Sequence, residues 1–179
     1  MKKLLILLFS LIPLYVCAQI NRTIYGIPLG SNIEEARLIL ESKGLTLASP
    51  IETKDGVSIG AINPYFSGIR WDLIAISSIN GKVYAISFNR KSNDVIKEGN
   101  NALDLLQKLT DKYGMYEAAS ESGQTETFDG FNFQYVMIDE LTRLTLYSEI
   151  HKYSECSITL VYIDKELRKI VESTLSDDL

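Results

Sequence analysis

The sequence predicts an α+β protein made of two tandem halves, each a helix followed by an antiparallel sheet, with the helices packed on one face of the sheet. Two segments with helical spacing of apolar residues each end at a glycine, and each is followed by segments in which apolar and polar residues alternate. A third helical pattern closes the chain and predicts a short C-terminal helix.

The first half, residues 19–91, is expected to begin with a helix at about 32–43. Ser31 and Glu34 match the capping box S-x-x-E, which satisfies free backbone N–H groups at the start of a helix. Gly44 follows the last periodic residue, and glycine is the usual residue just after a helix because it tolerates a positive φ.

The second half, residues 92–179, is expected to begin with a helix from about Asp94, which Gly114 ends. The expected core face of this helix carries Val95, Gly99, Ala102, Leu106, Leu109 and Tyr113. Asp164 is the expected N-cap of the final helix. Apolar residues at helical spacing follow it at Leu167, Ile170, Val171 and Leu175.

After each helix the apolar pattern changes to a period of two, which is typical of strands. The first half has strand patterns at 45–49, 57–62, 69–79 and 82–90, with turns at Asp55-Gly56 and Asn80-Gly81. The second half has them at 126–128, 131–138, 143–150 and 156–163. This repeated order indicates a duplicated unit within a single compact domain, residues 19–179.

The turn at Asn80-Gly81 fixes an expected strand register, because a two-residue loop pairs Ile79 with Lys82. The expected core face then pairs Ser77 with Tyr84, Ala75 with Ile86, and Leu73 with Phe88. The reverse face is expected to carry Arg70, Asp72, Ile74, Ile76 and Ser78 against Val83, Ala85, Ser87 and Asn89.

For the last hairpin, a loop at residues 151–155 pairs Ile150 with Cys156 and places apolar residues opposite one another: Ser148 and Ile158, Leu146 and Leu160, Leu144 and Tyr162. A loop one residue shorter matches them less well. The reverse face then shows Arg143, Thr145, Tyr147 and Glu149 beside Ser157 and Thr159.

Both halves are therefore expected to expose a hydroxyl-rich sheet face that is free to bind a partner. The candidate binding residues on this face are Arg70, Asp72, Ser87, Asn89, Arg143, Thr145, Tyr147 and Thr159.

The N-terminus has the pattern of a secretory signal peptide. Lys2 and Lys3 precede an apolar run at 4–16, and Val16-Cys17-Ala18 supplies a cleavage pattern after Ala18. The signal peptide is therefore expected at 1–18, and the mature protein is expected in the periplasm or secreted. Two alternatives remain at this stage: a retained membrane anchor, and a lipid anchor on Cys17.

Composition excludes several classes of function. The chain has a formal net charge of −5 and contains no Lys/Arg cluster, so we expect no nucleic-acid partner. Removal of residues 1–18 leaves Cys156 as the single cysteine, so no internal disulfide is expected. The sequence has no calcium loop, zinc-ligand set, dinucleotide fingerprint or P-loop, and no cofactor or metal is expected.

Two patterns suggest an enzyme, and both are weak. Gly56-Val57-Ser58-Ile59-Gly60 matches G-x-S-x-G, the turn that presents a nucleophilic serine in α/β-hydrolases, but that turn leads directly into a helix. Here Ala61-Ile62-Asn63-Pro64 extends a strand instead. Cys156 and His151 form a possible nucleophile and base, yet the register places Cys156 on the apolar face.

The segments "CAQ", "IYGIPLGSNIEEARLILESKGL" and "FSGIRWDLIAISSINGKVYAISF" resemble small exported proteins of unknown function from Gram-negative bacteria. The tandem helix-plus-sheet plan is also similar to that of β-lactamase inhibitory proteins and of small outer-membrane assembly lipoproteins. That likeness is architectural, and it implies a sheet face that grips a protein partner.

The leading hypothesis is an exported, non-enzymatic module that binds a protein or peptide of the cell envelope through the exposed sheet face. A small hydrolase or transferase using Ser58 or the Cys156/His151 pair is the second hypothesis. A purely structural envelope protein is the third.

Overall fold

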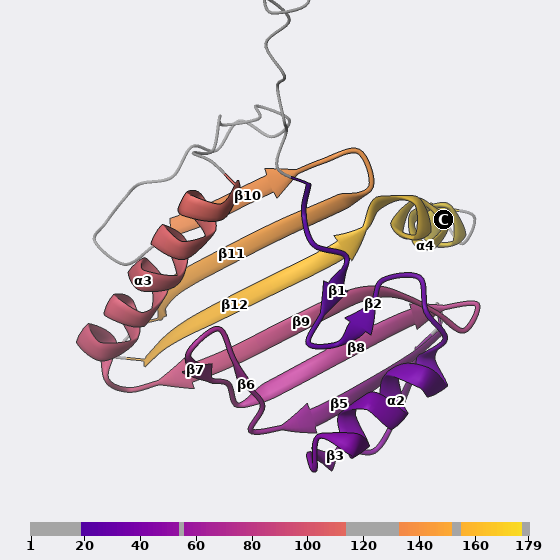
Figure 1. Ribbon diagram of the computed structural model, residues 1–179, viewed down its shortest axis with the longest axis horizontal. Helices are drawn as coiled ribbons and strands as arrows, with labels where there is room; N and C mark the ends of the chain where they lie inside the picture. The colour runs from indigo at the N-terminus through magenta and orange to yellow at the C-terminus, as the bar shows by residue number, and fades with distance from the viewer. Residues whose placement is uncertain (1–18, 54–55, 114–132, 152–154, 177–179) are drawn as a thin grey trace, which may run out of the picture.

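The computed structural model describes residues 19–53, 56–113, 133–151 and 155–176. Within these ranges the protein is α+β, with three helices and an antiparallel sheet of eight strands (Figure 1). The helices are α2 (Ile33–Ser42), α3 (Val95–Tyr113) and α4 (Lys165–Ser176). The predicted class is confirmed.

The strands of the main sheet run in the order β10-β11-β12-β9-β8-β5-β3, and β4 also pairs with β5. Their bounds are β3 Thr46–Leu47, β4 Ile51–Thr53, β5 Gly56–Ile62, β8 Leu73–Ile79, β9 Lys82–Ser92, β10 Phe133–Ile138, β11 Thr142–His151 and β12 Glu155–Asp164. The last strands of the two expected halves, β9 and β12, therefore lie side by side at the centre of the sheet.

Two small hairpins accompany the main sheet. They are β1 (Thr23–Ile24) with β2 (Ile27–Pro28), and β6 (Tyr65–Phe66) with β7 (Ile69–Arg70). The strand expected at 69–79 is thus divided into β7 and β8, and the strand expected at 45–49 is reduced to β3. The strand expected at 126–128 lies outside the described residues.

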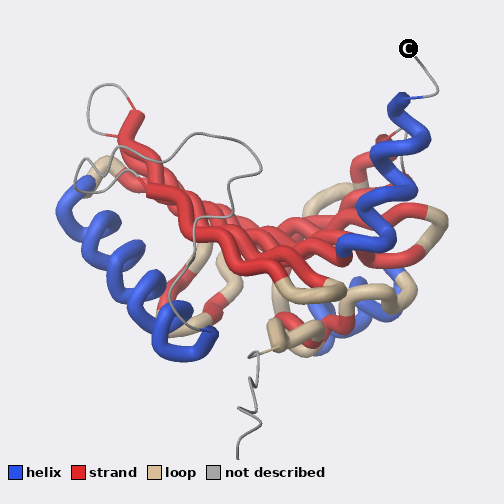
Figure 2. Tube along the Cα trace, turned by 90° about the horizontal axis from the view of Figure 1, so that it is seen from above, coloured by secondary structure: helices blue, strands red, loops and turns tan. Residues whose placement is uncertain are grey.

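The three helices do not share one face of the sheet. Helix α2 packs on β5, β8 and β9, and α3 packs on β11 and β12. Helix α4 packs on β8, β9 and β12 from the opposite side, as Figure 2 shows. The expectation of helices on one face concerned the helices that open the two halves, α2 and α3, and the C-terminal helix α4 lies on the other face.

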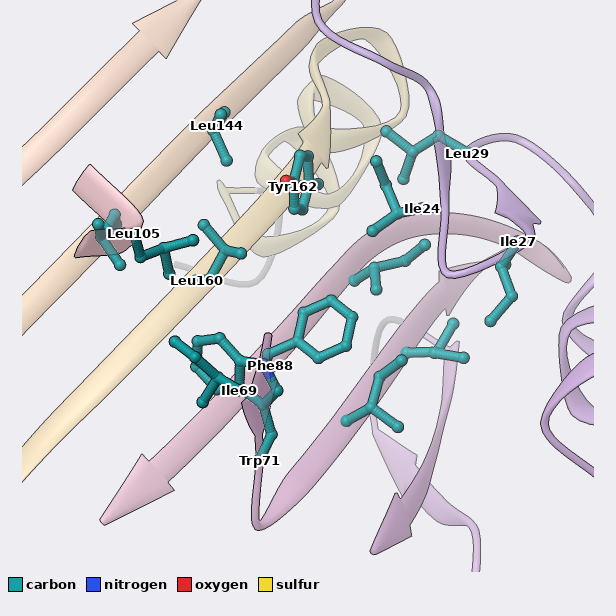
Figure 3. Close-up of a cluster of buried hydrophobic side chains, with 14 of the residues drawn as sticks. Ile24, Ile27, Leu29, Ile69, Trp71, Phe88, Leu105, Leu144, Leu160 and Tyr162 are labelled. Carbon is teal, nitrogen blue, oxygen red and sulfur yellow. The ribbon is translucent and has the colours of Figure 1, made fainter. Parts of the chain in front are cut away.

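The main core lies between the sheet and the layer formed by α2, α3 and the two small hairpins. Phe88 of β9 is fully buried in this core, among side chains from the N-terminal arm (residues 19–32), the β6–β7 hairpin and α3 (Figure 3). Its ring stacks on Phe66, with centroids 4.5 Å apart, and lies 5.5 Å from Trp71 and 6.0 Å from Tyr25. These aromatic contacts hold three separate segments of the chain together.

Two details of the helices differ from the sequence prediction. Asn32, and not Ser31, is the N-cap of α2, because its side chain accepts a 2.8 Å hydrogen bond from the backbone N–H of Glu34. On α3 the buried leucines are Leu105 and the predicted Leu109, whereas the predicted Leu106 is only half-buried. The core face of α3 also includes a buried carboxylate, Glu98.

The predicted register of β8 and β9 is correct at the turn and wrong beyond it. Ile79 pairs with Lys82 and Ser78 with Val83, but a β-bulge then shifts the pairing to Ser77 with Ala85. Ile74 and Ile76 consequently face the core opposite Phe88 and Ile86, although the sequence register placed both isoleucines on the reverse face. The residues that do face the reverse side are Leu73, Ala75, Ser77, Ala85, Ser87 and Asn89.

The predicted register of the last hairpin is confirmed. Ile150 pairs with Cys156, Leu146 with Leu160, and Leu144 with Tyr162. The pairing also reaches His151 and Glu155, so the strands extend further than expected.

Candidate functional site

The sheet face opposite α2 and α3, called the open face below, carries alternate residues of every long strand. Three rows cross it from β10 to β5. The first row is Ile138, Arg143, Ile163, Ala85, Ser77 and Ser58. The second is Val136, Thr145, Val161, Ser87, Ala75 and Gly60. The third is Gln134, Tyr147, Thr159, Asn89, Leu73 and Ile62.

Most of the predicted binding residues lie together on this open face: Ser87, Asn89, Arg143, Thr145, Tyr147 and Thr159. Arg70 does not, because it belongs to the β6–β7 hairpin on the helix side, where it pairs with Tyr65. Asp72 does not either. Its Oδ2 accepts a 2.7 Å hydrogen bond from the backbone N–H of Lys91 at the end of the sheet.

The hydroxyl groups at the centre of the open face are largely engaged with one another. Thr159 donates a 3.1 Å hydrogen bond to Asn89 Oδ1, and Asn89 Nδ2 donates to Ser87 at 3.5 Å. Ser58 Oγ lies 3.0 Å from Ser77 Oγ. These contacts join β12 to β9 and β5 to β8 across the sheet.

A groove of about 770 Å³ lies on the open face, between α4 and strands β10 to β12. This volume is within the range of roughly 300–1,000 Å³ that ligand sites occupy in proteins. The groove is lined by Ile138, Arg143, Thr145, Tyr147, Val161, Ile163, Lys165, Arg168, Lys169 and Glu172. Three of the predicted binding residues, Arg143, Thr145 and Tyr147, form its floor on β11.

The side chains on this floor are not committed to other contacts. Within the ranges that the structure describes, the side chains of Arg143, Thr145 and Tyr147 make no hydrogen bond or ion pair. Arg143 is exposed, Tyr147 is half-buried and Thr145 is 2% exposed. Arg143 and Tyr147 thus offer donors to the groove from one face of β11, with the buried Thr145 between them.

The α4 wall supplies three cations that the sequence analysis did not select. Lys165, Arg168 and Lys169 line the groove together with Glu172. These four residues follow the i, i+3, i+4, i+7 spacing of one helix face, a signal that is present in the sequence. The spacing alone does not show that these residues line a groove, because it does not show on which side of the sheet α4 packs.

Asp164 fixes the start of α4 and therefore one wall of the groove. Its Oδ1 accepts a 2.9 Å hydrogen bond from the backbone N–H of Leu167, and its Oδ2 forms an ion pair with Arg22 of the N-terminal arm. Arg22 also donates to Thr142 Oγ1 at 3.2 Å. The expected N-cap is confirmed, and it has a second role as the anchor of the arm.

Replacing Asp164 with alanine is expected to lower the free energy of unfolding by about 2 kcal/mol, since both the helix cap and the partner of Arg22 are lost. Asp164→Asn, which keeps a capping oxygen, is expected to lose about half as much. Urea denaturation followed by circular dichroism measures both values. Equal losses for the two variants would contradict the assigned capping role.

The two candidate nucleophiles, Ser58 and Cys156, both lie within strands of the main sheet. The G-x-S-x-G segment lies within β5, which continues to Ile62 without turning into a helix. A Cβ on Gly56, where φ is +147°, would lie 2.1 Å from the carbonyl oxygen of Ser78, so close strand packing accounts for this glycine. Ser58 faces Ser77 instead of a base.

Cys156 is 3% exposed, and its Sγ lies 3.3 Å from the carbonyl oxygen of Ser92. Burial raises the pKa of this thiol, and the negative charges of Glu98 and Asp94 raise it further. The thiolate fraction is therefore reduced. The side chain of His151 lies outside the described part of the structure.

Burial also raises the pKa of the phenols of Tyr135 and Tyr162, with an added effect of Tyr113 on each. Both phenols belong to the core on the helix side of the sheet, and neither lines the groove.

Among the described residues there is no cluster of three or more potential metal ligands, and no helix is long and apolar enough to cross a membrane. Comparison with protein-family models, curated proteins and solved structures finds no match to this chain.

Proposed function

We propose that this protein is an exported, non-enzymatic module that binds a protein or peptide of the cell envelope through the open face. The observation that carries this proposal is the groove between α4 and β11, whose floor consists of side chains without partners among the described residues. The N-terminal pattern at 1–18 supports export.

The arrangement of the sheet supports the same proposal. Its helix and strand order, with β9 beside β12, agrees with two tandem halves of about 19–91 and 92–179 that meet at the centre. A duplicated helix-plus-sheet unit leaves a sheet face for a partner beside the part that α4 covers, as in the β-lactamase inhibitory proteins that the plan resembles.

A photocrosslinking amino acid at position 147, incorporated in the native host, tests the proposal. It is expected to form a discrete adduct with one envelope protein, because Tyr147 lies on the groove floor. The matched control is position 65, since Tyr65 is 64% exposed on the helix side of the sheet. The same adducts from both positions, or none from either, would contradict binding through the open face.

Alanine at Arg143 is expected to reduce the yield of the adduct about tenfold, the loss typical of a central interface contact. Arg70→Ala is the matched arginine control, because Arg70 lies in the β6–β7 hairpin. Thermal unfolding of both variants verifies that neither change disturbs the fold.

A further inference from the structure

We propose that the groove selects an acidic, extended segment of its partner, and that Arg143 anchors one carboxylate of that segment. This inference rests on the proposed function and adds the chemistry of the ligand.

The charge of the groove opposes that of the whole protein. Its lining contains four cationic side chains, from Arg143, Lys165, Arg168 and Lys169, and a single carboxylate, from Glu172. The chain as a whole has a formal net charge of −5. A positive groove on an acidic protein favours an anionic ligand and repels cationic segments.

Arg143 is the cation best placed to bind a ligand carboxylate directly. The other three have partners within the protein: Lys165 donates to the carbonyl oxygen of Asp139 at 2.8 Å, Arg168 pairs with Glu172 at 3.0 Å, and Lys169 pairs with Glu166 at 2.8 Å. Arg143 has none among the described residues. Its planar guanidinium can accommodate both oxygens of a carboxylate at once.

The spacing of the floor residues fits an extended chain. Alternate residues of a strand are about 6.6–6.8 Å apart, and an extended peptide repeats its side chains at the same interval. Arg143 and Tyr147, which flank the buried Thr145 on the same face of β11, can therefore each meet a side chain on one face of such a segment. Ile138, Val161 and Ile163 supply apolar surface beside these donors.

An anionic membrane surface is the competing ligand, and the shape of the site disfavours it. Arg143 lies on the sheet, whereas α4 rises from the same side of the sheet and forms the other wall of the groove (Figure 2). A flat bilayer would meet α4 before it reached the floor. A single peptide segment can enter between the helix and the strands.

A phage-displayed library of random twelve-residue peptides, selected on the purified protein, tests the inference. Asp and Glu are expected to be about threefold enriched among the selected peptides relative to the input library. Binding of the leading peptide, measured by fluorescence anisotropy, is expected to weaken about tenfold for Arg143→Gln. Arg37→Gln is the matched control, since Arg37 is a surface arginine of α2 on the other side of the sheet.

The remaining outcomes bear separately on the acidic preference, on the role of Arg143, on the peptide as the ligand and on the proposed function. Enrichment of neutral or basic peptides that depends on Tyr147 would overturn the acidic preference and leave the proposed function intact. Acidic peptides that bind Arg143→Gln normally would overturn the role of Arg143. Phosphatidylglycerol vesicles that bind through Arg143 while no peptide is enriched would replace the peptide with a membrane. Absence of any binding would count against both the inference and the proposed function.

Discussion

Replacement of Glu98 by alanine is expected to lower the free energy of unfolding by about 3–5 kcal/mol, among the largest effects of any single substitution in this protein. Glu98 on α3 is 1% exposed, and its Oε1 lies 2.6 Å from Nε of Arg90 on β9. Its Oε2 accepts a 3.4 Å hydrogen bond from Asn101. Removing the carboxylate leaves a mostly buried guanidinium whose remaining hydrogen bond, within the part of the chain that the structure describes, is to the carbonyl oxygen of Arg70.

The matched control is the double variant Arg90→Met with Glu98→Leu. Replacing both charges with apolar side chains of similar volume removes the desolvation cost of each charge, so this variant is expected to lie within about 1 kcal/mol of the wild type. Guanidinium denaturation of the three proteins gives the comparison. A double variant as unstable as Glu98→Ala would show that the loss comes from packing and not from the unpaired charge.

Phe88→Ala is expected to cost about 3–5 kcal/mol, because a large side chain is removed where the surroundings can only partly collapse. The ring contacts Phe66, Trp71 and Tyr25, which come from the β6–β7 hairpin, the following loop and the N-terminal arm. Its loss therefore removes one contact from each of these segments at once.

Phe88→Leu, which retains most of the volume, is expected to cost about 1–2 kcal/mol. Differential scanning calorimetry of the two variants measures the difference. If alanine and leucine destabilise equally, the aromatic ring is not filling the space that the structure assigns to it. Binding in the groove is expected to persist in both variants below their unfolding temperatures, because Phe88 faces away from the open face.

The second half of the sheet could be predicted closely from its residues. In β11, Leu144 and Leu146 alternate with Arg143, Thr145 and Tyr147, and pairing the two leucines with Tyr162 and Leu160 of β12 matches apolar residues across the hairpin. That alternation placed Arg143, Thr145, Tyr147 and Thr159 on the open face correctly.

The first half was less determined, because β8 reads Leu73-Ile74-Ala75-Ile76, a run that is apolar on both faces. The periodicity of such a run does not indicate which face of the strand is buried. The answer comes from a distant segment: the backbone of Val83 hydrogen-bonds to Ser31 and Gly30, just before α2, and the bulge follows directly after Val83. The sequence pattern of the hairpin contains no sign of this contact.

By itself, then, the sequence determined the class of fold, the main helices, the principal strands and most of the hydroxyl groups on the open face, since each depends on local periodicity. Tertiary structure alone decided the bulge in β9, the removal of Arg70 to a separate hairpin and the side on which α4 packs. Each of these depends on contacts between segments far apart in the chain. The groove exists only because of the last of them, since its cations on α4 and its floor on β11 meet across the open face.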